Sequence, residues 1–265
     1  MSDDLIKILD GNTFVVSDSR GDIQASPTDP TGLFSFDTRF LSRWVLTVDG
    51  QRLNTLSVGD LQYFETRFFL VPGKGTVYVD AKLSVIRRRA GRDGFHAWLK
   101  ILNHDDKPVE LTVRIEAGSD FADLFEVKDA LKKKGRYSSR VEDGRLLLAY
   151  ERQAYRRSTV ISATAGARVD EEGLTFDVRI QPHGEWTTEI DVAASLPRVQ
   201  RRGGRRSPTG KRRKEDMESN LRRWIGDAPR LECDWEQLRV TYRRSLVDLA
   251  ALRFSLPITP GKSLP

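Results

Sequence analysis

The sequence has very few residues of the kinds that bind metals or form covalent cross-links. Its 265 residues include one cysteine, Cys233, and three histidines scattered along the chain. A single cysteine excludes an intramolecular disulfide, and one thiol with three separated histidines falls short of the clustered ligands of a zinc site. We therefore expect no disulfide, no metal and no cofactor, which fits a reducing, cytoplasmic compartment.

Long apolar runs are also missing. The N-terminal residues MSDDLIKILDG are acidic where the start of a secretory signal is basic, and no sustained apolar stretch follows them. Nowhere does an uninterrupted apolar run approach the roughly 20 residues that cross a bilayer. The sequence therefore predicts a soluble protein with no membrane partner.

The motifs of common catalytic sites are absent as well. The sequence contains no GxxxxGK[ST] loop, no GxSxG elbow, no HExxH pair and no paired cysteines. The segment PGKGT at 72–76 is rich in glycine, but it lacks the phosphate-loop spacing and is typical of a hairpin turn. A glycosidase needs two carboxylates about 5 to 9.5 Å apart, and the 38 acidic residues offer too many pairs for the sequence to select one. We therefore predict no catalytic residue.

Positive charge is concentrated in one segment. The net charge is +6, but RVQRRGGRRSPTGKRRK at 198–214 holds nine Lys or Arg residues and no acid, and the rest of the chain has 35 basic against 38 acidic residues. Charge repulsion together with glycine and proline predicts a flexible linker. Phosphate binding is the alternative, but no aromatic residue is interleaved for base stacking, so we do not expect a nucleic-acid partner.

Alternation with a period of two dominates the chain from about Phe14 to Ser195. Leu111, Val113 and Ile115 alternate with polar residues, and similar runs occur at 76–85 and 174–180. Turn dipeptides such as Asp49-Gly50 and Asp143-Gly144 separate the runs at short intervals, which predicts antiparallel hairpins. We therefore expect a mainly β domain, a large antiparallel sandwich of a dozen or so strands in two sheets, interrupted at 122–134 by a short helix or a long loop.

Residues 215–265 change to a helical period. Asp234 and Gln237 form a capping pattern, and apolar residues then recur at steps of three or four. These residues, called here the apolar stripe, are Trp235, Leu238, Tyr242, Leu246, Leu249 and Leu252. Met217, Leu221 and Trp224 predict a shorter helix before it. A helix with one apolar face has to bury that face against something, and this region offers no partner large enough.

One aromatic pair on a predicted strand is a candidate ligand contact. His96 and Trp98 in GFHAWLKIL lie on the strand face opposite Phe95 and Leu99. An aromatic ring beside a polar ring can form a platform for sugar stacking, although such a pair can equally be a simple cover for the sheet. A glucan contact at His96 and Trp98 therefore stays open at this point.

The most unusual stretch is GLFSFDTRFLSRWVLTVDG, which places charges among large apolar residues directly before a strand. Asp37 can cap a turn and Arg39 can pair with a carboxylate, so that the cluster fixes a chain crossing. The alternative is that Asp37, Thr38 and Arg39 line a ligand cleft. Trp44 and the alternate residues after it are expected to face the core.

This stretch resembles the N-terminal domain of bacterial glycogen debranching enzymes of the amylo-α-1,6-glucosidase type. In that family a Gly-hydrophobic-Asp-Thr-Arg-Phe-Leu-Ser run leads into a strand. DGNTFVVSDSRGDI at 10–23 is similar to the family's opening hairpin, and YRRSLVDLAALRF at 242–254 to the first helix of the domain that follows.

The resemblance implies a β-sandwich, supersandwich-like, ahead of an α-helical toroid that carries the glycosidase acids and hydrolyses α-1,6 branch points of glycogen-like glucans. It gives Asp37, Thr38 and Arg39 as motif positions, with an architectural role. We therefore expect a β domain at 1–197, a linker at 198–214 and, at 215–265, the start of the toroid, whose remainder is supplied in cis or in trans. This chain alone is expected to be inactive; a stand-alone glucan-binding module is the alternative.

Overall fold

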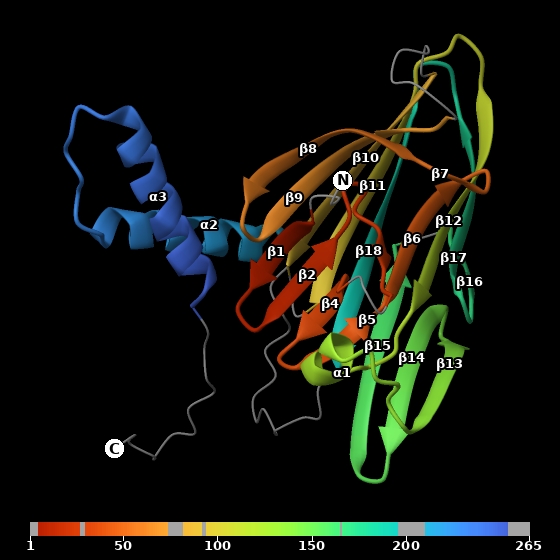
Figure 1. Cartoon of the computed structure of the whole chain (residues 1–265). Coiled ribbons are helices and arrows are strands. Elements are labelled where there is room, and N and C mark those ends of the chain that lie inside the picture. The colour runs from red at the N-terminus through yellow and green to blue at the C-terminus, as the bar shows by residue number, and fades with distance from the viewer. Residues whose placement is uncertain are drawn as a thin grey trace.

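Strands occupy most of the chain between Ile6 and Ser195, as the period of two predicts (Figure 1). The protein is seen in a computed structural model that describes residues 5–26, 30–73, 82–91, 94–164, 166–195 and 210–253, with side chains at all of these except 60–61 and 210–216. The predicted strand at 76–85 falls partly outside these ranges, and its described part begins at Leu83. The strands form three antiparallel sheets, which build two layers.

The largest sheet has eight strands and forms one complete layer. In spatial order they are β13 (Arg136–Glu142), β14 (Arg145–Arg152), β15 (Tyr155–Ala163), β18 (Glu185–Ser195), β11 (Gly94–Asn103), β10 (Leu83–Gly91), β9 (Glu65–Val71) and β8 (Asn54–Gln62).

Two smaller sheets share the opposite layer. The six-stranded sheet contains β16 (Arg168–Asp170), β17 (Gly173–Ile180), β12 (Val109–Gly118), β6 (Arg43–Val48) and β3 (Ile23–Gln24), with β7 (Gln51–Arg52) paired to β6. The four-stranded sheet contains β1 (Ile6–Asp10), β2 (Thr13–Ser17), β4 (Gly32–Ser35) and β5 (Thr38–Leu41). The predicted β-sandwich is thus confirmed, with one refinement, because its second layer is divided between two sheets. We call these three sheets together the β body.

Alternation along the strands fills the space between the layers. Trp44, Leu46 and Val48 of β6 are each at most 3% exposed, as predicted. The Trp44 ring meets Phe95 of β11 edge-on, with centroids 5.3 Å apart, so the six-stranded and eight-stranded sheets touch directly. Thr159 of β15 donates a hydrogen bond to the Phe40 carbonyl of β5 at 2.7 Å, which links the four-stranded sheet to the eight-stranded sheet. One continuous apolar core therefore joins all three sheets.

Two of the predicted hairpin turns have the backbone that their residues favour. Asp49 and Gly50 have φ values of 50° and 72°, and Asp143 and Gly144 have 49° and 70°. Positive φ at both central residues gives the turn a twist that matches the paired strands, and Asp-Gly accepts it at low cost. These turns join β6 to β7 and β13 to β14.

The interruption predicted at 122–134 contains one short helix, α1 (Leu124–Lys128). The Asp123 carboxylate accepts hydrogen bonds from the backbone N–H groups of Phe125 and Glu126, and the Glu126 side chain accepts one from the Asp123 N–H. This reciprocal capping explains why so short a helix starts where it does.

Two helices follow the sheets and differ from their predicted boundaries. α2 (Gly210–Asp227) is longer than expected, and its residues 210–214 come from the predicted linker, while residues 196–209 lie outside the described ranges. α3 (Glu236–Ala251) starts after Trp235, which occupies the N-cap position without a side-chain hydrogen bond. The predicted cap at Asp234 is therefore wrong, since the helix begins one residue too late for its carboxylate to serve as N-cap.

The helix pair lies at one edge of the β body, beside β1, β8 and β9 (Figure 1). A small second hydrophobic cluster of Phe64, Leu221 and Ala250 joins the helix pair to the β body. The indole N–H of Trp224 in α2 donates to the Leu246 carbonyl of α3 at 2.9 Å. Most of the apolar stripe stays outside this contact; its exposed members are Trp235, Leu238, Leu249 and Leu252, which are 59%, 39%, 54% and 69% exposed.

Candidate functional site

The sequence motif around Arg39 builds a rigid junction between β5 and the loop before α1. The Arg39 side chain is only 7% exposed, and its guanidinium forms a two-point ion pair with Asp120, with Nε–Oδ1 and Nη2–Oδ2 distances of 3.1 and 2.5 Å. A third donor, Nη1, reaches the Thr31 carbonyl at 3.3 Å. The predicted pairing of Arg39 with a carboxylate is thereby confirmed.

Asp37 and Thr38 extend this junction. The Thr38 hydroxyl donates to the Asp37 carboxylate at 3.0 Å and lies 3.2 Å from the Tyr155 hydroxyl of β15. The Asp37 carbonyl accepts from the Leu124 N–H at 3.0 Å. Phe36, beside them, has a φ of 54°, a turn conformation that a bulky residue rarely adopts. The three motif residues thus come together, and their contacts with Tyr155, Asp120 and Leu124 link distant parts of the chain, which favours an architectural role.

His96 and Trp98 also lie together, on the outer face of the eight-stranded sheet. The His96 ring is held between two carboxylates, with Nδ1 2.7 Å from Asp191 and Nε2 3.2 Å from Glu189. Its centroid is 4.1 Å from the Trp98 ring, and the Arg88 guanidinium lies 4.2 Å from the same ring. The predicted shared face is correct. Because Arg88 already covers Trp98, a glucan contact there stays a prediction.

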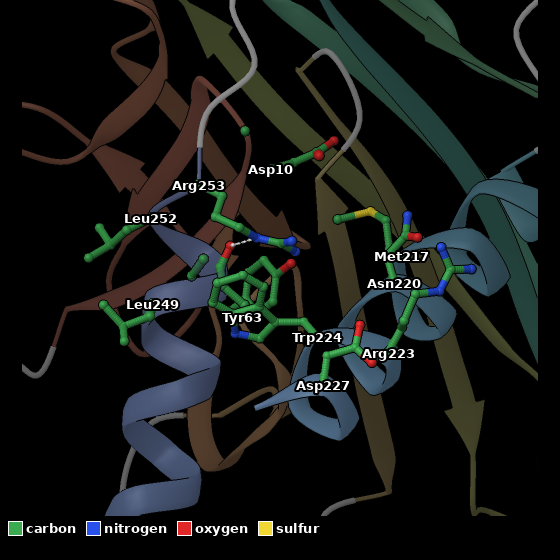
Figure 2. A pocket seen from close by; sticks show the side chains of 13 residues that line it. Asp10, Tyr63, Met217, Asn220, Arg223, Trp224, Asp227, Leu249, Leu252 and Arg253 are labelled. Atoms are coloured by element: carbon green, nitrogen blue, oxygen red, sulfur yellow. Dashed lines mark hydrogen bonds between the residues drawn. The ribbon is translucent and has the colours of Figure 1, made fainter. Parts of the chain in front are cut away.

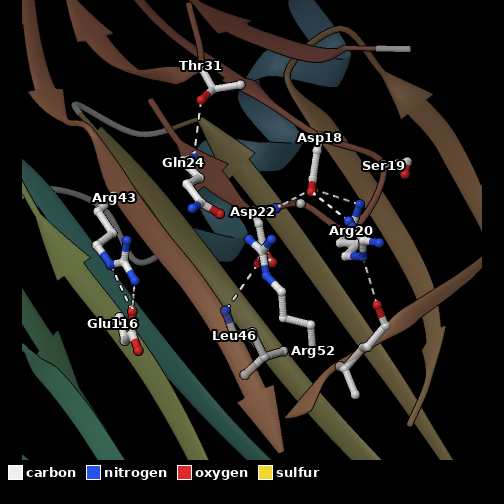
Figure 3. Close-up of polar contacts among 12 residues, drawn as sticks. Asp18, Ser19, Arg20, Asp22, Gln24, Thr31, Arg43, Leu46, Arg52 and Glu116 are labelled. Atoms are coloured by element: carbon white, nitrogen blue, oxygen red, sulfur yellow. Dashed lines mark hydrogen bonds and ion pairs between the residues drawn. The ribbon is translucent and has the colours of Figure 1, made fainter. Parts of the chain in front are cut away.

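A buried ionic cluster between the layers was not predicted from the sequence. Arg87 of β10 pairs with Asp22 at 2.6 Å, and both side chains are almost fully buried. Asp22 also accepts from the Leu46 N–H at 3.1 Å and lies 3.4 Å from Arg52 (Figure 3). The three consecutive arginines at 87–89 were the available signal, because alternation points the first and third inward.

Arg89 is the second inward-facing arginine and has no carboxylate in hydrogen-bonding contact among the described residues. Its Nη2 donates to the Gly21 carbonyl at 2.6 Å, and its guanidinium lies 4.6 Å from the Phe95 ring centroid. Burial, reinforced by the neighbouring Arg87 charge, lowers the pKa of Arg89 to about 9. Of these two inward-facing arginines, Arg87 is therefore a paired charge and Arg89 a poorly compensated one.

A surface hollow lies where the helix pair meets the β body, and we call it the junction pocket. Its volume is about 850 Å³. One wall comes from the β1–β2 and β8–β9 turns, a second from α2 and a third from the end of α3 (Figure 2). The lining residues are Asp10, Gly11, Tyr63, Met217, Asn220, Arg223, Trp224, Asp227, Leu249, Ala250, Ala251, Leu252 and Arg253.

Aromatic and charged groups meet on one side of this pocket. The Arg253 guanidinium lies 4.5 Å from the Trp224 ring centroid, and its Nε donates to the Ala250 carbonyl at 3.3 Å. Tyr63 projects from the β8–β9 turn toward them (Figure 2). Burial raises the pKa of the Tyr63 phenol, against the opposing effect of Arg253, so the hydroxyl stays protonated at neutral pH. None of these residues was predicted as a site, because they come from turns and helices far apart in the sequence.

Comparison with known families decides where the chain belongs. The family model described as the N-terminal domain of some glycogen debranching enzymes matches residues 8–191. The chain belongs to this family. The match runs from the third residue of β1 through most of β18, so the glycogen debranching enzyme N-terminal domain and the β body are nearly the same residues. It includes the Arg39 junction and His96, while α2 and α3 follow it.

Other comparisons add little about function. A putative kojibiose phosphorylase from the human microbiome is similar with 10% identity and a TM-score of 0.40, over 92% of this chain and 31% of that one. A polysaccharide lyase has 10% identity and a TM-score of 0.38, over 74% of this chain and 33% of that one. The chain thus spans about a third of the length of these proteins. No curated protein matches it.

Within the described residues, no group of three or more His, Cys, Asp or Glu side chains is placed to hold a metal ion. Over the same ranges, no helix is both long and apolar enough to cross a bilayer.

Proposed function

We propose that this chain is the non-catalytic N-terminal part of a debranching-type glycoside hydrolase. An α-helical domain, in the same or another polypeptide, supplies the acid and base that hydrolyse α-1,6 branch points of a glycogen-like glucan. The family match over residues 8–191 carries this proposal. The proposal also fits the contacts of the family motif, because Asp37, Thr38 and Arg39 contact other parts of the chain.

The exposed part of the apolar stripe supports a role in holding such a domain. Leu249 and Leu252 are more than half exposed on α3, next to Ala250 and Ala251, which are buried against the rest of the protein. Large apolar side chains gathered on one exposed helix face mark an interaction site. We therefore assign the apolar stripe to contact with the helical catalytic domain.

Two measurements test this proposal. The first is hydrolysis of a branched α-glucan by the isolated chain, which is expected to equal the buffer control. Turnover that disappears in the double variant Asp10→Asn/Asp227→Asn would contradict the proposal and would place an active site in the junction pocket.

The second is sedimentation of the chain with a separately produced helical domain of a debranching enzyme of this family. A complex is expected, and Leu249→Glu/Leu252→Glu should weaken it at least about tenfold, because charge is placed in an apolar contact. Arg243→Glu changes the net charge equally at an exposed position outside the stripe and serves as the control. Equal affinity of both variants would show that the stripe is not the contact.

A further inference from the structure

The polar and aromatic side of the junction pocket is not used in the proposal above, which takes only Leu249 and Leu252 from its lining, and this side has the groups of a ligand site. The pocket is large for a surface hollow, at about 850 Å³, and lies between two structural units, where small-molecule sites often occur. We propose that the junction pocket binds a segment of an α-glucan chain, an inference that rests on the proposed function for the class of sugar.

The charges of the pocket favour a neutral ligand. Among the described residues that line it, Asp10 and Asp227 are acidic and Arg223 and Arg253 are basic. A phosphate or nucleic-acid ligand would require an excess of Lys and Arg. A lining with balanced charge provides both donors and acceptors without attracting an ion, which suits a chain of hydroxyl groups.

The polar groups are spread along the pocket as a polyhydroxylated ligand needs. Asn220, Arg223 and Asp227 follow one another along α2 at steps of three and four, so they share one face of the helix. Asp10 lies on the other side, on the β body (Figure 2). The amide and the guanidinium can donate to sugar hydroxyls, and the carboxylates can accept from them.

Rings supply the apolar part of the site. Tyr63 and Trp224 present aromatic surface between these polar groups, and Met217 adds a thioether on α2 (Figure 2). Rings with a polar end suit ligands that expose C–H and O–H groups side by side, as sugars do. A lipid-like ligand would instead require a lining without four charged side chains.

The test is calorimetric titration of the full chain with maltoheptaose, an α-1,4-linked glucan, and with cellohexaose, its β-1,4-linked counterpart. Maltoheptaose is expected to bind and cellohexaose to bind at least about tenfold more weakly. The double variant Asn220→Ala/Asp227→Ala should weaken maltoheptaose binding at least about tenfold, because a hydrogen bond to a charged group contributes about 1.5 kcal/mol or more. Both residues are exposed on α2, so the fold should be retained, and helical circular dichroism checks this.

Ser219→Ala/Arg222→Ala is the matched control, since both residues are exposed on α2 outside the pocket lining and the affinity should stay unchanged. Absence of maltoheptaose binding, equal binding of cellohexaose, or full affinity in the pocket variant would each overturn the inference. Loss of binding in Trp98→Ala with full affinity in the pocket variant would move the site to the outer sheet face. None of these outcomes affects the proposed function, which is tested by hydrolysis and by sedimentation with the helical domain.

Discussion

The β body and the helix pair are held together in different ways. In the β body, apolar residues from all three sheets form one continuous core. In the helix pair, the buried apolar residues of the described chain are limited to Leu221, Ala250 and Ala251, and the contact with the β body passes through Phe64. The first unit buries its apolar faces within itself, whereas the second leaves most of its apolar stripe in water.

We therefore regard the β body as the folding unit and the helix pair as a smaller unit packed on it. Free energy of folding comes largely from apolar area removed from water, so the β body should determine the global stability. The helix pair adds little burial and should open locally without unfolding the sheets. Its exposed stripe is then best understood as a surface for the helical domain that the family match leads us to propose.

The largest effect in the β body is expected at its buried ion pair. Arg87→Met removes the closest charged partner of Asp22, and we expect the unfolding free energy to fall by about 3 kcal/mol, because the buried carboxylate keeps only the longer contact with Arg52. Urea denaturation measures this fall in unfolding free energy. The same change should leave the local opening of the helix pair unaltered.

Arg89→Met is the matched control for this prediction. Arg89 sits on the same strand, two residues away, but has no carboxylate in hydrogen-bonding contact among the described residues, so a hydrophobic replacement should be neutral or stabilising. Equal losses of unfolding free energy in Arg87→Met and Arg89→Met would show that the burial of the guanidinium, and not its pairing, determines the loss.

A smaller effect is expected at the family motif. Arg39→Met should lower the unfolding free energy by about 2 kcal/mol, since it removes hydrogen bonds to a charged group from a nearly buried side chain. Arg43→Met, four residues later, removes an exposed pair with Glu116 and should cost less than about 0.5 kcal/mol. Thermal unfolding compares the stabilities of the two variants. Similar costs would contradict the structural role assigned to Arg39.

The smallest effect concerns the cap of α1. Asp123→Ala should cost about 1 kcal/mol at neutral pH, a typical value for loss of an N-cap. Hydrogen bonds from the backbone, that of Glu126 first, lower the pKa of Asp123. Its stabilisation is therefore present above the unfolded pKa of about 3.9 and is lost as pH falls through the lowered folded value.

Urea denaturation of wild type and Asp123→Ala at several pH values checks this dependence. The difference between the two proteins should shrink below about pH 4. A constant difference down to pH 2 would mean that the carboxylate charge is not what stabilises the cap. α3 provides the contrast, since its N-cap position holds Trp235 and makes no such bond.

Sequence was sufficient for features that depend on local patterns. Alternation located the strands, and Asp-Gly located two hairpin turns, because both follow from backbone geometry over a few residues. The motif and its family followed from a short run of residues. Even the pairing of Arg39 with a carboxylate was predictable, although its partner, Asp120, was not.

Features that depend on distant contacts were missed. Burial of Arg87 requires Asp22, which is 65 residues away, and nothing local distinguishes it from a solvated arginine. The stripe of α3 predicted an apolar face, but not that Leu246 and Ala250 near its end would make the contacts with α2 and the β body while the rest stayed exposed. The junction pocket combines two turns and two helices and has no local signature.

Hydrogen exchange of the intact chain, followed by mass spectrometry, tests most directly whether the β body and the helix pair are separate units. Amides of α3 should exchange at least about 100-fold faster than those of β11, which corresponds to a difference of about 2.7 kcal/mol in opening free energy. Equal protection in α3 and β11 would place the helices in the same cooperative unit as the sheets and would contradict the account.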